Sequence, residues 1–183
     1  MYTRILRQIR SFLRDTSGTA AMETVILMPL LFWTYMALAV YFDAFKTRSA
    51  TEKAAFTISD VLSRETSSID EVYLAGVHNL FDFIAKSAEE TSLRVSVVSY
   101  STVNQAYALE WSEVDGDAEA LTASDLLLME ESLPVMSNGE NLILVETFST
   151  YDPGGEWVVT GVKNFSTFIF TRPRFAPQLT WAS

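Results

Sequence analysis

Gly18 and Glu23 stand five residues apart at the entrance of an uncharged run of nineteen residues, from Thr24 to Phe42. A glycine lets the backbone lie extended and unobstructed in a protease cleft. A carboxylate at the edge of an apolar run is costly in lipid unless it finds a partner. These residue types at this spacing suggest a processing site fused to a membrane helix that later becomes an assembly surface. The alternative at this point is an uncleaved signal-anchor whose glutamate reaches the lipid interface.

The element that carries this site is a long helix. At ~1.5 Å per residue, the uncharged run nearly spans the ~30 Å hydrocarbon layer. Pro29 lies within it and is expected to remove one backbone hydrogen bond and kink the helix. Residues 43–64 contain neither glycine nor proline, so one helix is predicted from about Ala20 to Arg64. Its second half has an apolar stripe at helical spacing, formed by Ala50, Ala54, Ala55, Ile58, Val61 and Leu62.

Charge is distributed unevenly along the chain, whose formal net charge is −10. Four basic residues precede the apolar run: Arg4, Arg7, Arg10 and Arg14. From Asp43 onward there are nine Lys or Arg against 21 Asp or Glu. Because basic residues stay on the cytoplasmic side, the leader should remain there and rest on anionic lipid, while the acidic part is translocated. An acidic domain is also a poor partner for nucleic acid.

The composition argues against catalysis and against a bound cofactor. The chain has no cysteine and one histidine, His78. Most zinc sites and most nucleophile–base pairs need more than that, so we expect no catalytic residues, no metal and no cofactor. His78 is expected to be a surface or half-buried residue near Asp82. The alternating carboxylates of residues 113–119 lack the glycine and the final glutamate of an EF-hand loop, so a solvated acidic loop is expected and calcium binding stays open.

Residues 67–183 are predicted to form one α+β domain. Ser68 and Glu71 have capping-box spacing and should begin a helix that ends near Lys86. Its expected buried face consists of Ile69, Val72, Tyr73, Gly76, Leu80, Phe83 and Ile84. The remaining elements are expected as strands at 93–103, 107–111, 142–148 and 165–171, with a short helix capped by Thr122 between the second and third. Short turns favour an antiparallel sheet packed on the second half of the long helix, with Trp111, Tyr107, Trp157 and Phe168 as sheet and core aromatics.

Arg172 and Arg174 close the last strand. They could bind a carboxylate from the long helix or from a neighbouring subunit, although a solvated strand end is the default interpretation. The residues that follow them are expected to be loosely held.

Several of these segments together resemble one family. They are the basic leader with Phe12-Leu13-Arg14-Asp15, the stretch Gly18-Thr19-Ala20-Ala21-Met22-Glu23, Pro29 six residues after the glutamate, Thr150-Tyr151-Asp152-Pro153, and Arg172-Pro173-Arg174. The pattern is similar to that of the TadE-like pseudopilins of tight-adherence (Tad/Flp) pilus systems. The resemblance implies a pilin-like fold, a bacterial inner-membrane location with a periplasmic C-terminal domain, and a structural role in pilus biogenesis and adhesion.

The resemblance also implies a division of the chain and a set of partners. Residues 1–18 would be a cleaved cytoplasmic leader, 19–42 the transmembrane helix, 43–66 its amphipathic continuation and 67–183 the periplasmic domain. A prepilin peptidase would cut between Gly18 and Thr19, and Glu23 and Pro29 would serve assembly with other pilins or pseudopilins and the inner-membrane platform. Arg172 and Arg174 would have a structural role.

Two alternatives to this interpretation remain. The chain could be an uncleaved membrane-anchored binding module that never polymerises. It could also carry a cleavable signal peptide, because Ala37-Leu38-Ala39 satisfies the small-x-small rule and would leave Val40 as the first residue.

Overall fold

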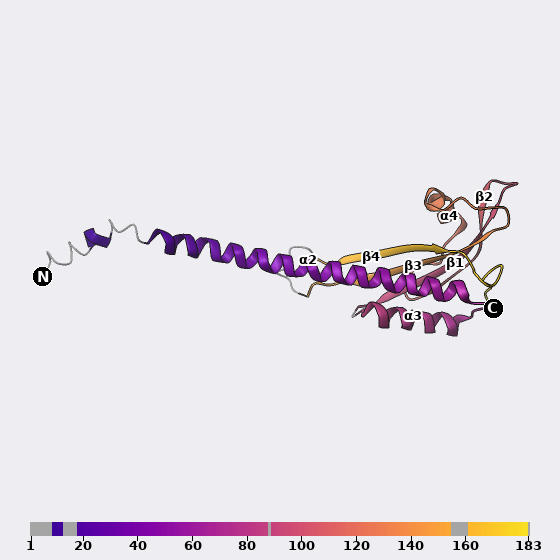
Figure 1. Cartoon of the computed structure of the whole chain (residues 1–183), viewed down its shortest axis with the longest axis horizontal. Coiled ribbons are helices and arrows are strands. Elements are labelled where there is room, and N and C mark those ends of the chain that lie inside the picture. The colour runs from indigo at the N-terminus through magenta and orange to yellow at the C-terminus, as the bar shows by residue number, and fades with distance from the viewer. Residues whose placement is uncertain (1–8, 13–17, 88, 155–160, 183) are drawn as a thin grey trace. The chain divides into compact units, whose positions relative to one another are not determined.

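The computed structural model describes residues 9–12, 18–87, 89–154 and 161–182. The chain divides into two compact units, Met1–Phe42 and Asp43–Ser183, which are described separately. One element, helix α2 (Thr19–Arg64), contributes residues to both (Figure 1). The prediction of one continuous helix from the uncharged run to Arg64 is therefore confirmed, and the helix continues through Pro29. Of the four leader arginines, only Arg10 lies in the described ranges.

The second unit is built on a four-stranded sheet in the order β2-β1-β3-β4, with every neighbouring pair antiparallel. The strands are β1 (Thr91–Ser101), β2 (Ala106–Asp115), β3 (Asn141–Tyr151) and β4 (Lys163–Thr171). This confirms the predicted α+β class. The prediction that residues 113–119 form a loop is wrong at its start, because β2 continues to Asp115 opposite Leu93 of β1. The expected aromatic Trp157 lies outside the described residues.

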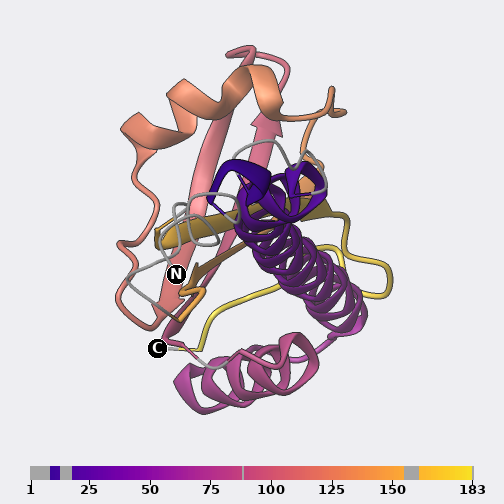
Figure 2. The same ribbon diagram turned by 90° about the vertical axis from the view of Figure 1, so that its left-hand side faces the viewer.

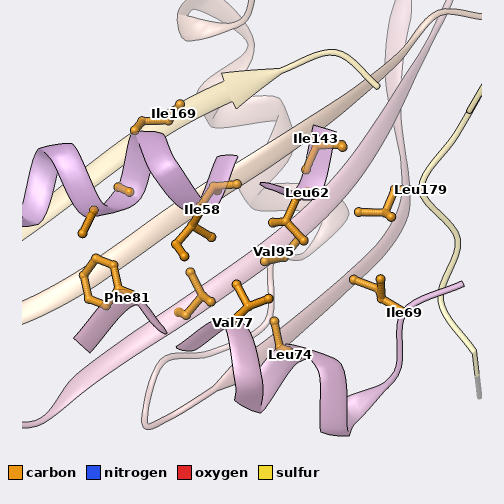
Figure 3. Packing of buried hydrophobic residues seen from close by; sticks show 14 of the residues in the cluster. Ile58, Leu62, Ile69, Leu74, Val77, Phe81, Val95, Ile143, Ile169 and Leu179 are labelled. Carbon is orange, nitrogen blue, oxygen red and sulfur yellow. The ribbon is translucent and has the colours of Figure 1, made fainter. Parts of the chain in front are cut away.

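One face of the sheet packs against the second half of α2 and against α3 (Glu71–Ala85). Ile58 and Leu62 of α2 are fully buried against Val95 and Ile143, which point from the two central strands (Figure 3). Ala54 and Ala55, also fully buried, are short enough to let the helix lie close to the strands. The predicted packing of the long helix on the sheet is confirmed.

Helix α3 begins and packs differently from the prediction. Its N-cap is Asp70, whose carboxylate accepts a hydrogen bond from the Tyr73 amide at 2.8 Å, so Ser68 is not the cap. Its buried face consists of Leu74, Val77, Phe81 and Ala85. Val72 and Phe83, expected inside, are each 80% exposed. The prediction is wrong for these two residues, whereas Ile69 is buried and Tyr73 and Ile84 pack against the core, so the true buried face is rotated from the predicted one.

The other face of the sheet is covered by α4 (Ala123–Met129), the 3-10 turn η1 (Glu130–Ser132) and their flanking loops. In Figure 2, α3 and α4 lie on opposite sides of the sheet. Thr122 caps α4 in the predicted capping box: its hydroxyl accepts from the Asp125 amide, and the Asp125 carboxylate accepts from the Thr122 amide. Leu126 then inserts beside Leu144 in the second, smaller core.

Residues 172–182 form a C-terminal strap, and the expectation that they are loosely held is wrong. Leu179 is 1% exposed, and its carbonyl accepts a hydrogen bond from the Trp111 indole at 2.9 Å. The strap pairs in parallel with the α2–α3 connection: the Ile69 amide donates to Thr180, and the Ala182 amide donates to Ile69. A buried leucine and a paired backbone hold this segment as firmly as a strand edge.

Candidate membrane-spanning and processing segment

Gly18 lies immediately before α2. Its carbonyl accepts the amide of Met22 at 3.0 Å, the first hydrogen bond of the helical ladder, so the first helical residue is Thr19. The position that a Cβ would occupy at Gly18 has no atom within 4 Å among the described residues. The peptide bond between Gly18 and Thr19 is therefore exposed and lies at the helix boundary, where a cut leaves α2 whole.

Glu23 lies one turn inside the helix, four residues after Thr19, and its side chain is exposed. Within the described ranges, Glu23 makes no ion pair. Pro29 follows on the same helix and cannot donate to the carbonyl of Val25, which leaves one acceptor without its usual partner. A carboxylate at the edge of the apolar run and a helix position without an amide donor thus both lie near the N-terminal end of α2.

The apolar stretch itself is exposed. The described residues contain one helix long and apolar enough to cross a membrane, α2, and none of its most apolar window is buried inside the chain. Phe32, Trp33 and Tyr35 are each more than half exposed. Two threonines satisfy their hydroxyls within the helix, Thr24 on Ala20 and Thr34 on Leu30, both at 2.8 Å. Internally bonded hydroxyls add little cost in lipid.

The two arginines after β4 have different partners. Arg174 reaches Asp60 of α2 at 3.2 Å, and its amide donates to the Ser63 carbonyl at 2.8 Å. Arg172 pairs instead with Glu140, before β3, at 2.6 Å. Arg174 therefore contacts the long helix, one of the two alternatives that the sequence left open, and Arg172 does not. Both ion pairs are half exposed, so each contributes ~1 kcal/mol or less.

His78 joins three elements. Its Nδ1 lies 2.9 Å from Asp115 at the end of β2, and its Nε2 lies 2.7 Å from the hydroxyl of Thr91 at the start of β1. Thr91 in turn donates to Asp82, one turn further along α3. The side chain of His78 is 12% exposed. These hydrogen bonds tie α3 to the edge of the sheet.

An ion pair that the sequence analysis did not identify lies within the sheet. Arg94 and its cross-strand neighbour Glu146 make two hydrogen bonds of 2.7 Å each, and Arg94 also donates to the Glu119 carbonyl. Their side chains are 15% and 9% exposed. The signal in the sequence is a single opposite charge in the middle of each of two apolar strands. The described residues include no group of three or more side chains that could hold a metal ion.

Gly18, Thr19, Glu23 and Pro29 thus follow one another along the first turns of a single exposed helix, whereas Arg172 and Arg174 belong to the second unit. Neither a family model, nor a curated protein, nor a solved structure matches this chain.

Proposed function

We propose that this chain is a minor pseudopilin of a Tad/Flp-type pilus assembly system, processed by a prepilin peptidase and acting structurally in pilus biogenesis and adhesion. The observation that carries the proposal is α2. One unbroken helix has an exposed apolar first half, and its second half is packed on an antiparallel sheet. A domain attached in this way can leave lipid by exchanging lipid contacts for contacts with neighbouring helices.

The processing step fits the helix boundary. Water would add across the peptide bond between Gly18 and Thr19, leaving a carboxylate on the leader and an ammonium on Thr19. The cut removes the hydrogen bond between Gly18 and Met22 and none further along the ladder. The new ammonium sits at the positive end of the helix dipole, where a cation is disfavoured and a nearby carboxylate is favoured.

Glu23 is the carboxylate that can supply this charge. In an isolated subunit, Glu23 lies one turn from its own Thr19, about 6 Å along the helix axis. In a bundle, the ammonium of one subunit neutralises Glu23 of its neighbour, where an unpaired charge would be expensive. This pairing selects one axial register between subunits. The partners are then a prepilin peptidase, other pilins or pseudopilins, the inner-membrane assembly platform and membrane lipid.

N-terminal sequencing of protein extracted from the native host's membranes tests the processing step. We expect Thr19 as the first residue. Retention of Met1 would overturn the proposal in favour of an uncleaved, membrane-anchored binding module, and a start at Val40 would indicate a secreted product. A Gly18→Leu variant expressed with the cognate peptidase should keep its leader, and Gly76→Ala, a glycine change in α3, should be cleaved normally.

A second experiment tests the role of Glu23. Glu23→Gln should insert into the membrane and be cleaved, but it should enter fibres at least tenfold less than wild type. Glu71→Gln, which removes an exposed carboxylate from the first turn of α3, serves as the matched control. Normal incorporation of the Glu23 variant would refute the pairing.

A further inference from the structure

A cavity of about 300 Å³ opens in the second unit, where three elements meet. The first residues of α2 in this unit, Asp43 and Lys46, form one side. The C-terminal end of α3 at Lys86 and the end of β3 at Ser149 and Asp152 form the others. Its volume is at the lower end of the range for small-molecule sites.

The wall of this cavity contains a buried hydroxyl that lacks a partner. Ser149 is 7% exposed, and within the described part of the chain its Oγ has no hydrogen-bond partner. Side chains alternate along β3, so Ser149 shares a face with Val145, which packs against α2, and with Tyr151, whose hydroxyl donates to Asp43 of α2. Its hydroxyl therefore faces the helices and the cavity between them. A buried hydroxyl without a partner is unfavourable, and a bound polar group would supply the missing hydrogen bond.

The charges around the cavity are mixed. Lys46 and Lys86 can bind an anion, and they approach from two different helices. Asp43, Asp152 and Glu89 can bind a cation. This pattern fits a small zwitterion with an anionic and a cationic group. Carboxylates accept hydrogen bonds from a primary ammonium, whereas a quaternary ammonium favours a cage of aromatic rings.

The position of the cavity along the chain indicates where such a ligand would come from. Asp43 directly follows the apolar run, and Lys46 lies about 4.5 Å further along the helix axis. The headgroup layer on each side of the hydrocarbon core is ~5–8 Å thick. If residues 24–42 span a bilayer, both side chains lie at the depth of the phospholipid headgroups.

We propose that this cavity binds the headgroup of a phosphoethanolamine lipid, with the phosphodiester at Lys46 and Lys86 and the primary ammonium at Asp43 and Asp152. The hydroxyl of Ser149 donates to the phosphate. The bound lipid joins the base of the sheet domain to the membrane surface. The proposal rests on membrane anchoring by α2, and it does not require the cut after Gly18.

Native mass spectrometry of the full chain in detergent micelles tests the proposal. The micelles are supplemented in turn with phosphatidylethanolamine, phosphatidylglycerol or phosphatidylcholine. Wild type should retain one phosphatidylethanolamine, and the Lys46→Gln/Lys86→Gln double variant should retain at least tenfold less. Lys53→Gln, which removes an exposed lysine of α2 away from the cavity, should behave as wild type. Ser149→Val, which replaces the hydroxyl with apolar methyl groups, should also lose the lipid, with far-UV circular dichroism as the check on folding.

Three outcomes would overturn the proposal. Equal retention by the double variant and Lys53→Gln would remove the role of the two lysines. Equal retention of all three lipids would remove the headgroup selectivity. Displacement of the lipid by water-soluble glycerophosphoethanolamine at comparable concentration would show that the cavity binds a free phosphoethanolamine compound. The ligand would then not come from the membrane, as proposed. Lipid retention by a chain that still begins at Met1 would support this site while refuting the pilus function.

Discussion

Replacing Ile58 with alanine tests whether α2 holds the sheet through the face seen in the structure. The Ile58 side chain is fully buried at the centre of the main core, between the helix and the two central strands. Two residues earlier on the same helix, Phe56 is 63% exposed. Replacing either side chain with alanine changes the same helix, in one case at a buried position and in the other at an exposed one. The difference between the two losses of stability therefore reports the packing of the buried side chain and not a change in helix propensity.

The expected cost of Ile58→Ala follows from its burial. The substitution removes three carbons, worth ~2.5 kcal/mol of transfer free energy at ~0.8 kcal/mol each. A partly unrelaxed cavity should raise the loss to about 3–4 kcal/mol. Phe56→Ala should change the free energy of unfolding by no more than ~0.5–1 kcal/mol because most of the ring already faces solvent. With an m-value near ~2 kcal/mol/M, the urea midpoint should fall by about 1.5–2 M for Ile58→Ala.

Urea unfolding of the full chain in detergent micelles measures both variants. Trp111 and Trp181, whose rings lie 5.6 Å apart beside the core, provide a fluorescence signal for the sheet domain. The reasoning is refuted if Ile58→Ala costs no more than Phe56→Ala, because the buried stripe of α2 would then not be the surface that packs on the sheet.

Three further changes can be measured in the same assay. Gly116→Ala should lower the free energy of unfolding by more than ~2 kcal/mol, because φ is +108° and an added Cβ would lie 2.6 Å from a neighbouring hydroxyl. Gly76→Ala, in open space on α3, should raise it by about 0.5–1 kcal/mol, and equal effects of the two changes would contradict this reasoning. Arg94→Met should lower the free energy of unfolding by ~3–5 kcal/mol, because it leaves Glu146 charged and unpaired. Adding Glu146→Leu should restore most of this loss, and a double variant as unstable as Arg94→Met would show that the unpaired charge is not the cause. Hydrogen bonds from the amides of the two following residues lower the pKa of Glu65 from its ordinary 4.5. The stability difference between wild type and Glu65→Gln should therefore be full at neutral pH and vanish as the pH falls through the lowered pKa. A difference that persists below this pKa would refute the stabilising role of the ionised carboxylate.

The sequence was a good guide where one local signal dominated. The absence of glycine and proline between Asp43 and Arg64 predicted the continuous helix, and Thr122 with Asp125 predicted the start of α4. The predicted buried face of α3 was rotated from the true one because Val72 and Phe83 have the same helical spacing as the residues that are truly buried. The side of α3 that is buried depends on where the sheet packs, and the sequence of the helix alone does not contain that information.

Contacts between distant segments were beyond prediction for the same reason. Nothing near Leu179 indicates that it fills a gap beside Trp111, and nothing near His78 indicates that Asp115 and Thr91 will meet it. The roles proposed for Gly18 and Glu23 depend on spacing along one helix and not on the folded domain, so they could be proposed from the sequence alone.

The C-terminal strap has a mechanical consequence. Arg174 bonds to the last turn of α2 through its backbone and its side chain, and Ile69 is paired on both sides with residues 180–182. Tension entering α2 from its N-terminal end therefore cannot separate the whole of its second half from the sheet without also breaking this clasp, which joins two segments more than a hundred residues apart in the chain.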